Sequence, residues 1–103
     1  MRKEEGFKMI SDVFLTGRIT KVLNKTTRYV EVERLVPDQG KYVVDNIPVS
    51  FWNKEPNSFF MKLNEGTLIV LRGRIQNEEQ FGIIVIAEQL AVLGEKSLQP
   101  QGG

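Results

Sequence analysis

The sequence predicts an all-β fold, a small five-stranded barrel with one short helix between the third and fourth strands. Three observations lead to this prediction. Stretches of alternating apolar and polar residues recur along the chain, as they do in half-buried strands. One central segment changes to helical spacing. Two of the strand stretches contain an internal glycine, which is typical of strands that bend enough to close a small barrel.

The first half of the chain contains three strand patterns separated by turn-forming residues. Residues 9–23, "MISDVFLTGRITKVL", keep a two-residue period and are interrupted by Gly17. After the loop "NKTT", the stretch "RYVEVERLV" at 28–36 alternates again. The sequence "PDQGK" at 37–41 has the proline and glycine of a hairpin turn. The third pattern is "YVVDNIPVSFWN", residues 42–53.

The second half supplies the helix and two more strands. Residues 54–66 carry apolar side chains at helical spacing and end on a glycine, which predicts a helix of two to three turns. Residues 67–76 alternate and contain the second bend glycine, Gly73. The short turn "NEEQ" leads into 81–93, where the run "IIVI" favours a buried strand. The alternation places these residues in the core: Val13, Leu15, Ile19, Val30, Val32, Ile47, Val49, Phe51, Ile69, Leu71 and Ile75. It places these on the outer face: Phe14, Pro48, Ser50, Leu68 and Val70.

This element order, three strands, a helix and two strands, is that of the OB-fold, a five-stranded Greek-key barrel. At 103 residues the chain forms one domain, which we place at 9–93 after an N-terminal extension, 1–8, and before a flexible tail, 94–103. No apolar run reaches membrane-spanning length, and the N-terminus has no signal-peptide core. We therefore expect a cytoplasmic protein with no membrane partner.

Composition limits the chemistry. The chain has no cysteine and no histidine, which excludes disulfides, thiolate metal sites and Ser-His or Cys-His catalysis. We expect no cofactor, no metal and no small-molecule substrate. The 14 Lys and Arg residues nearly balance 13 Asp and Glu residues. A nucleic-acid ligand would therefore require the positive charge to be concentrated on one surface.

Several segments together resemble bacterial single-stranded DNA-binding proteins, the SSB family. "DVFLTGRIT" is similar to the family's first strand, "VEVER" to its second and "IPVSFWNK" to its third. "FFMKLNEGTLIVLRGRIQ" resembles the helix, turn and fourth strand, and "VIAEQLAVL" resembles the last strand. The resemblance covers roughly residues 12–93 and implies an oligomeric, non-enzymatic OB-fold protein that binds and protects single-stranded DNA.

The chain also departs from the family pattern. The long basic hairpin between the last two strands is reduced to "NEEQ". Stacking aromatics found in many members are replaced near Val36 and Asn46, and the acidic Pro-Phe tip is absent. The chain thus resembles a pared-down member, and the small primosomal replication protein PriB is a similar comparison.

Trp52 is the strongest candidate for base stacking. It lies opposite Val49 and Phe51 in the alternation, so its ring cannot enter the same core. Exposed aromatic rings beside cationic side chains are the means by which proteins hold single strands. The alternative is packing at a subunit interface or under the helix. The full candidate set for nucleic-acid binding is Trp52, Arg72, Arg74, Arg18, Lys54, Tyr29, Tyr42, Arg28, Lys21 and Lys25.

The arginines and tyrosines have structural alternatives too. Arg18, Arg72 and Arg74 share outer faces of strands that are neighbours in an OB barrel, so we expect one phosphate-binding patch. They could instead form surface ion pairs of little energetic value, for example with Glu31 or Glu33. The tyrosines, Tyr29 and Tyr42, could extend a stacking surface or only cover the edge of the core.

Two alternative functions remain open. The near-neutral charge and missing hairpin also suit an OB-fold protein-interaction module, such as a primosome-like or other accessory subunit. A carboxylate enzyme using, for example, Asp45 with Glu88 is a third alternative, but nothing in the sequence brings these two residues together. The outward apolar residues Phe14, Leu68 and Val70 predict a homo-oligomer, a dimer or tetramer.

Overall fold

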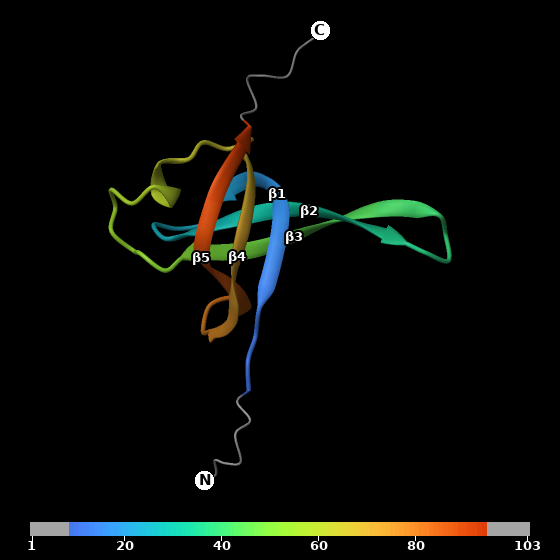
Figure 1. Cartoon of the computed structure of the whole chain (residues 1–103), viewed down its shortest axis with the longest axis horizontal. Coiled ribbons are helices and arrows are strands. Elements are labelled where there is room, and N and C mark those ends of the chain that lie inside the picture. The colour runs from blue at the N-terminus through green and yellow to red at the C-terminus, as the bar shows by residue number, and fades with distance from the viewer. Residues whose placement is uncertain (1–8, 95–103) are drawn as a thin grey trace, which may run out of the picture.

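The computed structural model describes residues 9–94 and forms a closed five-stranded barrel with one long hairpin extending from it (Figure 1). The strands are β1 (Val13–Val22), β2 (Thr27–Val36), β3 (Lys41–Phe51), β4 (Leu68–Glu78) and β5 (Gly82–Gly94). They close in the order β1-β2-β3-β5-β4, with β3 and β5 parallel and all other neighbours antiparallel. The predicted OB-fold is confirmed. The predicted extension, and the predicted tail beyond Gly94, lie outside the described residues.

Both predicted bend glycines lie where another strand comes too close for a side chain. A Cβ on Gly17 in β1 would collide with the carbonyl oxygen of Glu31 in β2. A Cβ on Gly73 in β4 would collide with the carbonyl oxygen of Ile86 in β5. Because the ladder of β4 with β5 also shifts register between Arg72 and Gly73, the strand bends there and the barrel closes.

The predicted helix is only a single 3-10 turn, Phe60–Lys62. Its hydrogen bonds all join residues three apart, beginning with the Ser58 amide, which donates to the Glu55 carbonyl oxygen. One anchor holds this segment: Phe60 is fully buried and closes one end of the barrel, while its neighbour Phe59 is 53% exposed. Phe60 is the only fully buried apolar side chain of the segment, and Met61 and Leu63 are partly buried, so packing gains too little to extend the turn into a longer helix.

The alternation of side chains is confirmed over most of the barrel, with two corrections. The core contains Ile19, Val30, Val49, Ile69 and Leu71, as predicted. Ile75, predicted to be inside, is 48% exposed because it lies beyond Gly73, where the pairing of β4 with β1 ends and only β5 remains beside the strand. Ser50, predicted to be outside, is buried, and its hydroxyl donates to the Thr26 carbonyl oxygen at 2.8 Å.

Beyond the barrel, β2 and β3 continue together as a two-stranded ribbon, seen at the right of Figure 1. We call this ribbon, residues 32–45, the arm. The predicted turn closes it: the Gly40 amide donates to the Val36 carbonyl oxygen at 2.9 Å, and Gly40 has a φ of 62°. Within residues 9–94 no helix is long and apolar enough to cross a membrane.

Candidate nucleic-acid interface

The outer face of β1, β2 and β3 presents Trp52 at the end of β3. The tryptophan side chain is 59% exposed, while its amide donates to the Ala87 carbonyl oxygen at 2.9 Å and fixes the backbone to β5. Its ring lies 5.8 Å from that of Phe51, which lies 5.8 Å from that of the buried Phe60. The indole therefore lies beside a pair of rings that reaches the core, while most of its own surface is open to solvent.

A row of side chains on neighbouring strands lies on the same outer face as Trp52, farther along the sheet. The register pairs Lys21 of β1 with Tyr29 of β2, and Tyr29 with Pro48 of β3. Pro48 lies four residues before Trp52, about 13 Å along the strand. Tyr29 is half-buried, so part of its side chain is open to solvent. The row supplies a second flat ring and a cation on the face that carries Trp52.

Lys54 and Lys25 add positive charge at the same end of the barrel. The Lys54 ammonium donates to the Ser50 hydroxyl oxygen at 3.0 Å, which holds the charge close to the strand that carries Trp52. Lys25 is exposed in the loop between β1 and β2, next to Thr26, whose carbonyl oxygen accepts the Ser50 hydrogen bond. We define the Trp52 face as Trp52, Tyr29, Pro48, Lys21, Lys25 and Lys54.

Arg28 does not belong to this face. It is 6% exposed and closes the barrel end beside Phe60, with its guanidinium carbon 5.8 Å from the ring centre. Its guanidinium donates to the carbonyl oxygens of Asn24, Thr27 and Met61. Desolvation by burial lowers the pKa of Arg28 from its usual value. The structure removes Arg28 from the candidate set, because its charge serves the loop and the 3-10 turn.

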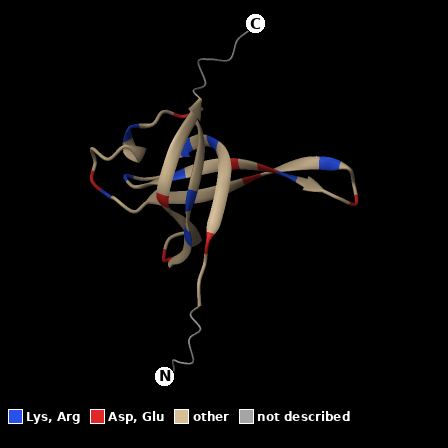
Figure 2. Cartoon of the chain, viewed as in Figure 1, with Lys and Arg blue, Asp and Glu red and all other residues tan. Residues whose placement is uncertain are grey.

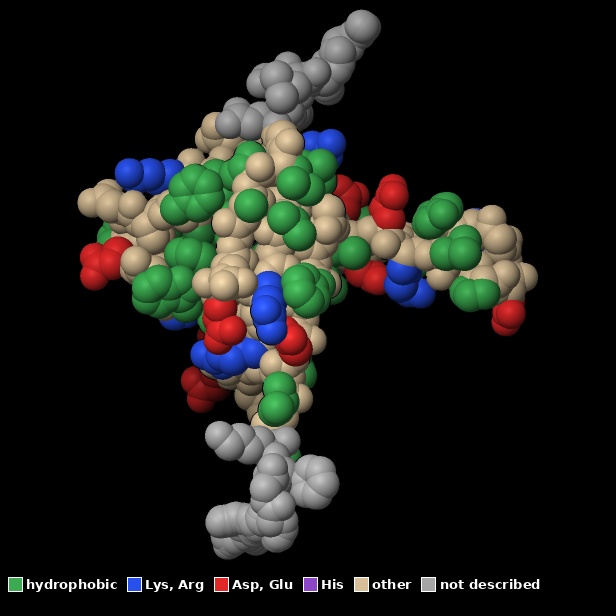
Figure 3. All heavy atoms as spheres, viewed as in Figure 1, with side chains coloured by type: hydrophobic (Ala, Val, Ile, Leu, Met, Phe, Trp, Pro, Cys, Tyr) green, Lys and Arg blue, Asp and Glu red, His purple; other side chains and the backbone are tan. Residues whose placement is uncertain are grey.

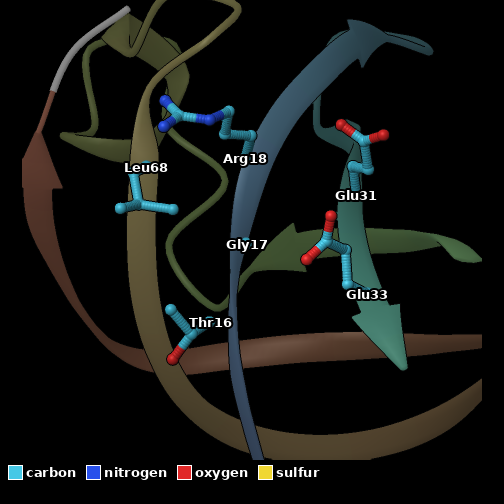
Figure 4. A pocket seen from close by; sticks show the side chains of 6 residues that line it. All are labelled: Thr16, Gly17, Arg18, Glu31, Glu33 and Leu68. Atoms are coloured by element: carbon cyan, nitrogen blue, oxygen red, sulfur yellow. The ribbon is translucent and has the colours of Figure 1, made fainter. Parts of the chain in front are cut away.

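The predicted patch of three arginines does not form. β1 and β4 are neighbours as expected, but Arg18 lies opposite Leu68, four residues or about 13 Å from Arg72. Arg18 donates to the Gly66 carbonyl oxygen at 2.8 Å. In the shallow pocket of about 490 Å³ that it lines, Arg18 extends toward β4, while Glu31 and Glu33 lie on the other side of β1 (Figure 4).

The other two arginines are held in ion pairs. Arg72 forms two hydrogen bonds with the Asp12 carboxylate, at 3.1 and 3.2 Å, and its guanidinium carbon lies 5.5 Å from the Phe14 ring centre. The hydrogen bond with Asp12, strengthened by the carboxylate charge, raises the pKa of Arg72. Arg74 pairs with Glu88 at 3.1 Å. Acidic and basic positions are therefore interspersed over the barrel (Figure 2).

Tyr42 lies far from Trp52. It is in the arm, ten residues before Trp52 and about 33 Å away along β3, with 67% of its side chain exposed. Glu31 and Glu33 lie between the two ends of this surface, opposite Asn46 and Val44. Asp45 pairs with Arg34 on the arm and Glu88 with Arg74 on the barrel, so the two carboxylates of the enzyme alternative belong to separate ion pairs.

Within the described residues, no group of three or more acidic side chains is placed to hold a metal ion. The Trp52 face brings the rings of Trp52 and Tyr29 and three lysines to one side of the barrel, and the sequence had indicated all five of these residues. Sequence reasoning missed the arm. Its one indication was the length of the alternation on both sides of "PDQG", which exceeds what a barrel of this size requires.

Structural comparison finds related folds among single-stranded DNA-binding proteins. The mitochondrial protein Rim1 of S. cerevisiae has a TM-score of 0.56 and 14% identity over 85% of this chain and 99% of that chain. Another crystal form of Rim1 gives 0.57, with 82% and 94% covered at 14% identity. A small single-stranded DNA-binding protein from Streptomyces coelicolor gives 0.50 and 11% identity over 82% and 95%. No family model and no curated protein sequence matches the chain. At these identities the likeness establishes that the chain shares the OB-fold of these proteins.

Proposed function

We propose that this protein binds single-stranded DNA, without catalysis, by stacking bases on the Trp52 face and contacting phosphates with its lysines. The observation that carries the proposal is the exposed Trp52 ring, backed by Phe51 and flanked by Lys54. Stacking on an aromatic ring contributes about 1–3 kcal/mol per base and tolerates any base. The likeness in fold to proteins described as single-stranded DNA-binding supports the same ligand.

We propose that the Trp52 face acts in an oligomer. One copy offers only Trp52 and Tyr29 as rings near its lysines, so linking copies would raise the effective affinity. The outer face of β1, β4 and β5 presents Phe14, which is 70% exposed, beside a shallow groove of about 260 Å³ lined by Val70, Leu90 and Ala91. Apolar side chains gather on this side of the barrel (Figure 3), and exposed apolar patches mark interfaces.

Titration of the intrinsic fluorescence with oligo-dT at two salt concentrations tests the DNA proposal, because Trp52 is the only tryptophan. Stacking quenches the emission, and phosphate contact makes the affinity fall as salt rises. Quenching that is insensitive to salt would remove the lysines from the proposal. If no oligonucleotide changes the emission or binds by anisotropy, the protein does not act on single strands.

A protein-interaction module is the second candidate, and the ion pairs of the surface arginines favour it. Arg34, Arg72 and Arg74 are each bound to a carboxylate, so the surface has mixed sign away from the Trp52 face. Failure of the titration above, together with capture of a defined partner protein that Trp52→Ala releases, would support this candidate.

A further inference from the structure

The arm has two strand edges with no neighbour in the described part of the chain. Pairing of β2 with β1 stops at Glu31, and pairing of β3 with β5 is confined to Val49–Phe51. Residues 32–45 therefore form a two-stranded ribbon that projects clear of the barrel (Figure 1). Such a ribbon is only marginally stable in water, and unpaired edges readily accept another strand.

One face of the arm is apolar and exposed. Leu35 is 49% exposed, Tyr42 67% and Val44 46%. Leu35 lies directly opposite Tyr42 in the register, and Val44 lies two residues from Tyr42, so all three point to the same side of the ribbon. Apolar side chains are visible along the arm in Figure 3. The ribbon has no second layer to cover them, so an additional strand beside β3 would give them new neighbours.

We propose that the arms of two copies of this chain pair antiparallel through their β3 edges, with Val43 opposite Val43. In this register Lys41 lies opposite Asp45 of the second copy, and Tyr42 lies opposite Val44 of the second copy. Two-fold symmetry makes each of these contacts twice. Opposite charges and aromatic with β-branched pairs are the cross-strand combinations that stabilise antiparallel sheets. The β3 edge is thus complementary to itself in both charge and shape.

Other pairings of the arm lack this complementarity. Centring the β3 edges on Val44 would place Asp45 opposite Val43 and Lys41 opposite Ile47, so neither charge would find a partner. The β2 edge is less complementary in charge, because an antiparallel pairing of two β2 edges centred on Arg34 places two arginines opposite each other. Shifting the β2 edge toward the turn brings in Pro37, which has no N–H to donate. Among these symmetric pairings, charge favours the β3 edge centred on Val43.

The result would be a four-stranded sheet running from β2 through two β3 strands to the second β2. On its apolar face Tyr42 would lie between Leu35 of its own chain and Val44 of the other. Because Tyr42 is about 33 Å from Trp52 along β3, this contact leaves the Trp52 face free. Arm pairing would join copies bound to adjacent stretches of a strand, which is a physical basis for cooperative binding. The pairing itself requires no DNA.

A charge-reversal experiment tests the register. Sedimentation is measured without DNA, in a Phe14→Ser background that disrupts the other proposed contact. Lys41→Asp places Asp opposite Asp45, and Asp45→Lys places Lys opposite Lys41, so each variant should associate about tenfold more weakly. In an equimolar mixture every pair is again opposite in sign, and association should return. The Asp45→Lys copies still lack their ion pair with Arg34 in the mixture, so this pair cannot explain a recovery of association.

A cysteine pair gives a second, geometric test in the otherwise unchanged chain, which has no cysteine of its own. Directly opposed residues of an antiparallel pair lie about 4.5–5.5 Å apart, within the reach of a disulfide. Val43→Cys should therefore form a cross-linked dimer under mild oxidation. Leu35→Cys, which is more exposed than Val43 but at least about 14 Å from its counterpart across three strand spacings, should not.

Three results would overturn the proposal. The first is that Lys41→Asp and Asp45→Lys, each alone, associate as strongly as the Phe14→Ser parent. Another is a mixture no stronger than its components. The third is equal cross-linking of the two cysteine variants, which would mean random collision. If the arm binds a different protein, the first of these results is expected. The three measurements use no DNA, so they do not depend on whether Trp52 binds DNA.

Discussion

The two ends of the β2–β3 ribbon are built from the same strands but present different surfaces. At the barrel end, one side of the ribbon contributes the buried core side chains Val30 and Val49, and the other carries Trp52. At the arm end, neither side is covered, and Tyr42 stands exposed beside Leu35. The barrel end can therefore hold an aromatic ring rigidly for a flexible ligand, whereas the arm gains stability only by acquiring another strand.

Charge separates the two ends further. Lys21, Lys25 and Lys54 lie around the barrel end, and none of them forms an ion pair with another residue of 9–94. The base of the arm carries Glu31 and Glu33, which would repel a phosphate backbone. An aromatic residue is therefore suited to bases at one end and to another protein surface at the other. Equivalent side chains on one continuous face need not share a ligand.

The largest expected effect comes from removing the support of the barrel end. Phe60→Ala should lower the free energy of unfolding by about 3–5 kcal/mol, because it deletes a fully buried ring and leaves a cavity beside Phe51 and Arg28. Urea unfolding followed by Trp52 fluorescence measures the loss. Phe59→Ala is the matched control, since its ring is half exposed and its removal should change stability by less than about 1 kcal/mol. Equal losses in both variants would contradict the assignment of Phe60 as the barrel plug.

The second prediction separates the two aromatic residues directly. Trp52→Ala should weaken binding to single-stranded DNA by about 1–3 kcal/mol with little loss of stability, because its ring is exposed. Tyr42→Ala should leave the affinity of one isolated copy within about twofold. Anisotropy of a labelled oligonucleotide is the measurement, since the first variant has no tryptophan.

The labelled oligonucleotide is too short to bind two copies of the protein, so assembly of the protein on DNA does not affect the measured affinity. A loss for Tyr42→Ala as large as that for Trp52→Ala would show that the stacking surface continues onto the arm. Unfolding of Trp52→Ala would instead make its ring part of the core.

Much of the barrel could be predicted from the sequence because its determinants are local. Alternation fixed which side of β1 to β3 is apolar, and the two glycines marked the places where strands approach closely. The exposure of β4 beyond Gly73 could not be predicted, because it depends on where the pairing of β4 with β1 ends. The helix prediction failed because spacing alone does not reveal that Phe60 is the only apolar side chain of this segment to be fully buried.

The candidate site was predictable only in part. Trp52 follows from parity and from the resemblance, and its exposure agrees with both. Arg28 looked like a loop cation, but whether a side chain beside a turn lies inside or outside depends on how the barrel end closes. Arg72 and Arg74 looked available because their partners, Asp12 and Glu88, are distant in sequence. Ion pairs across a sheet are visible only once the register is known.

The smallest expected effect concerns salt, and it compares the lysines of the two ends. Each lysine that contacts a phosphate releases counterions, so log affinity falls as log salt rises. Lys54→Gln and Lys21→Gln should each make this slope less steep by about 0.7 for a single strand. Lys41→Gln, on the arm, should leave the slope unchanged, and so should Arg72→Gln, whose charge is already paired with Asp12. The slope is obtained from anisotropy titrations on the same short oligonucleotide at four or more salt concentrations. If Lys41 changes the slope as much as Lys54, the phosphate track follows β3 into the arm, and the acidic pair at its base does not divide the surface. If only Lys21 and Lys54 change the slope, the lysines and Trp52 both place the bound DNA at the barrel end.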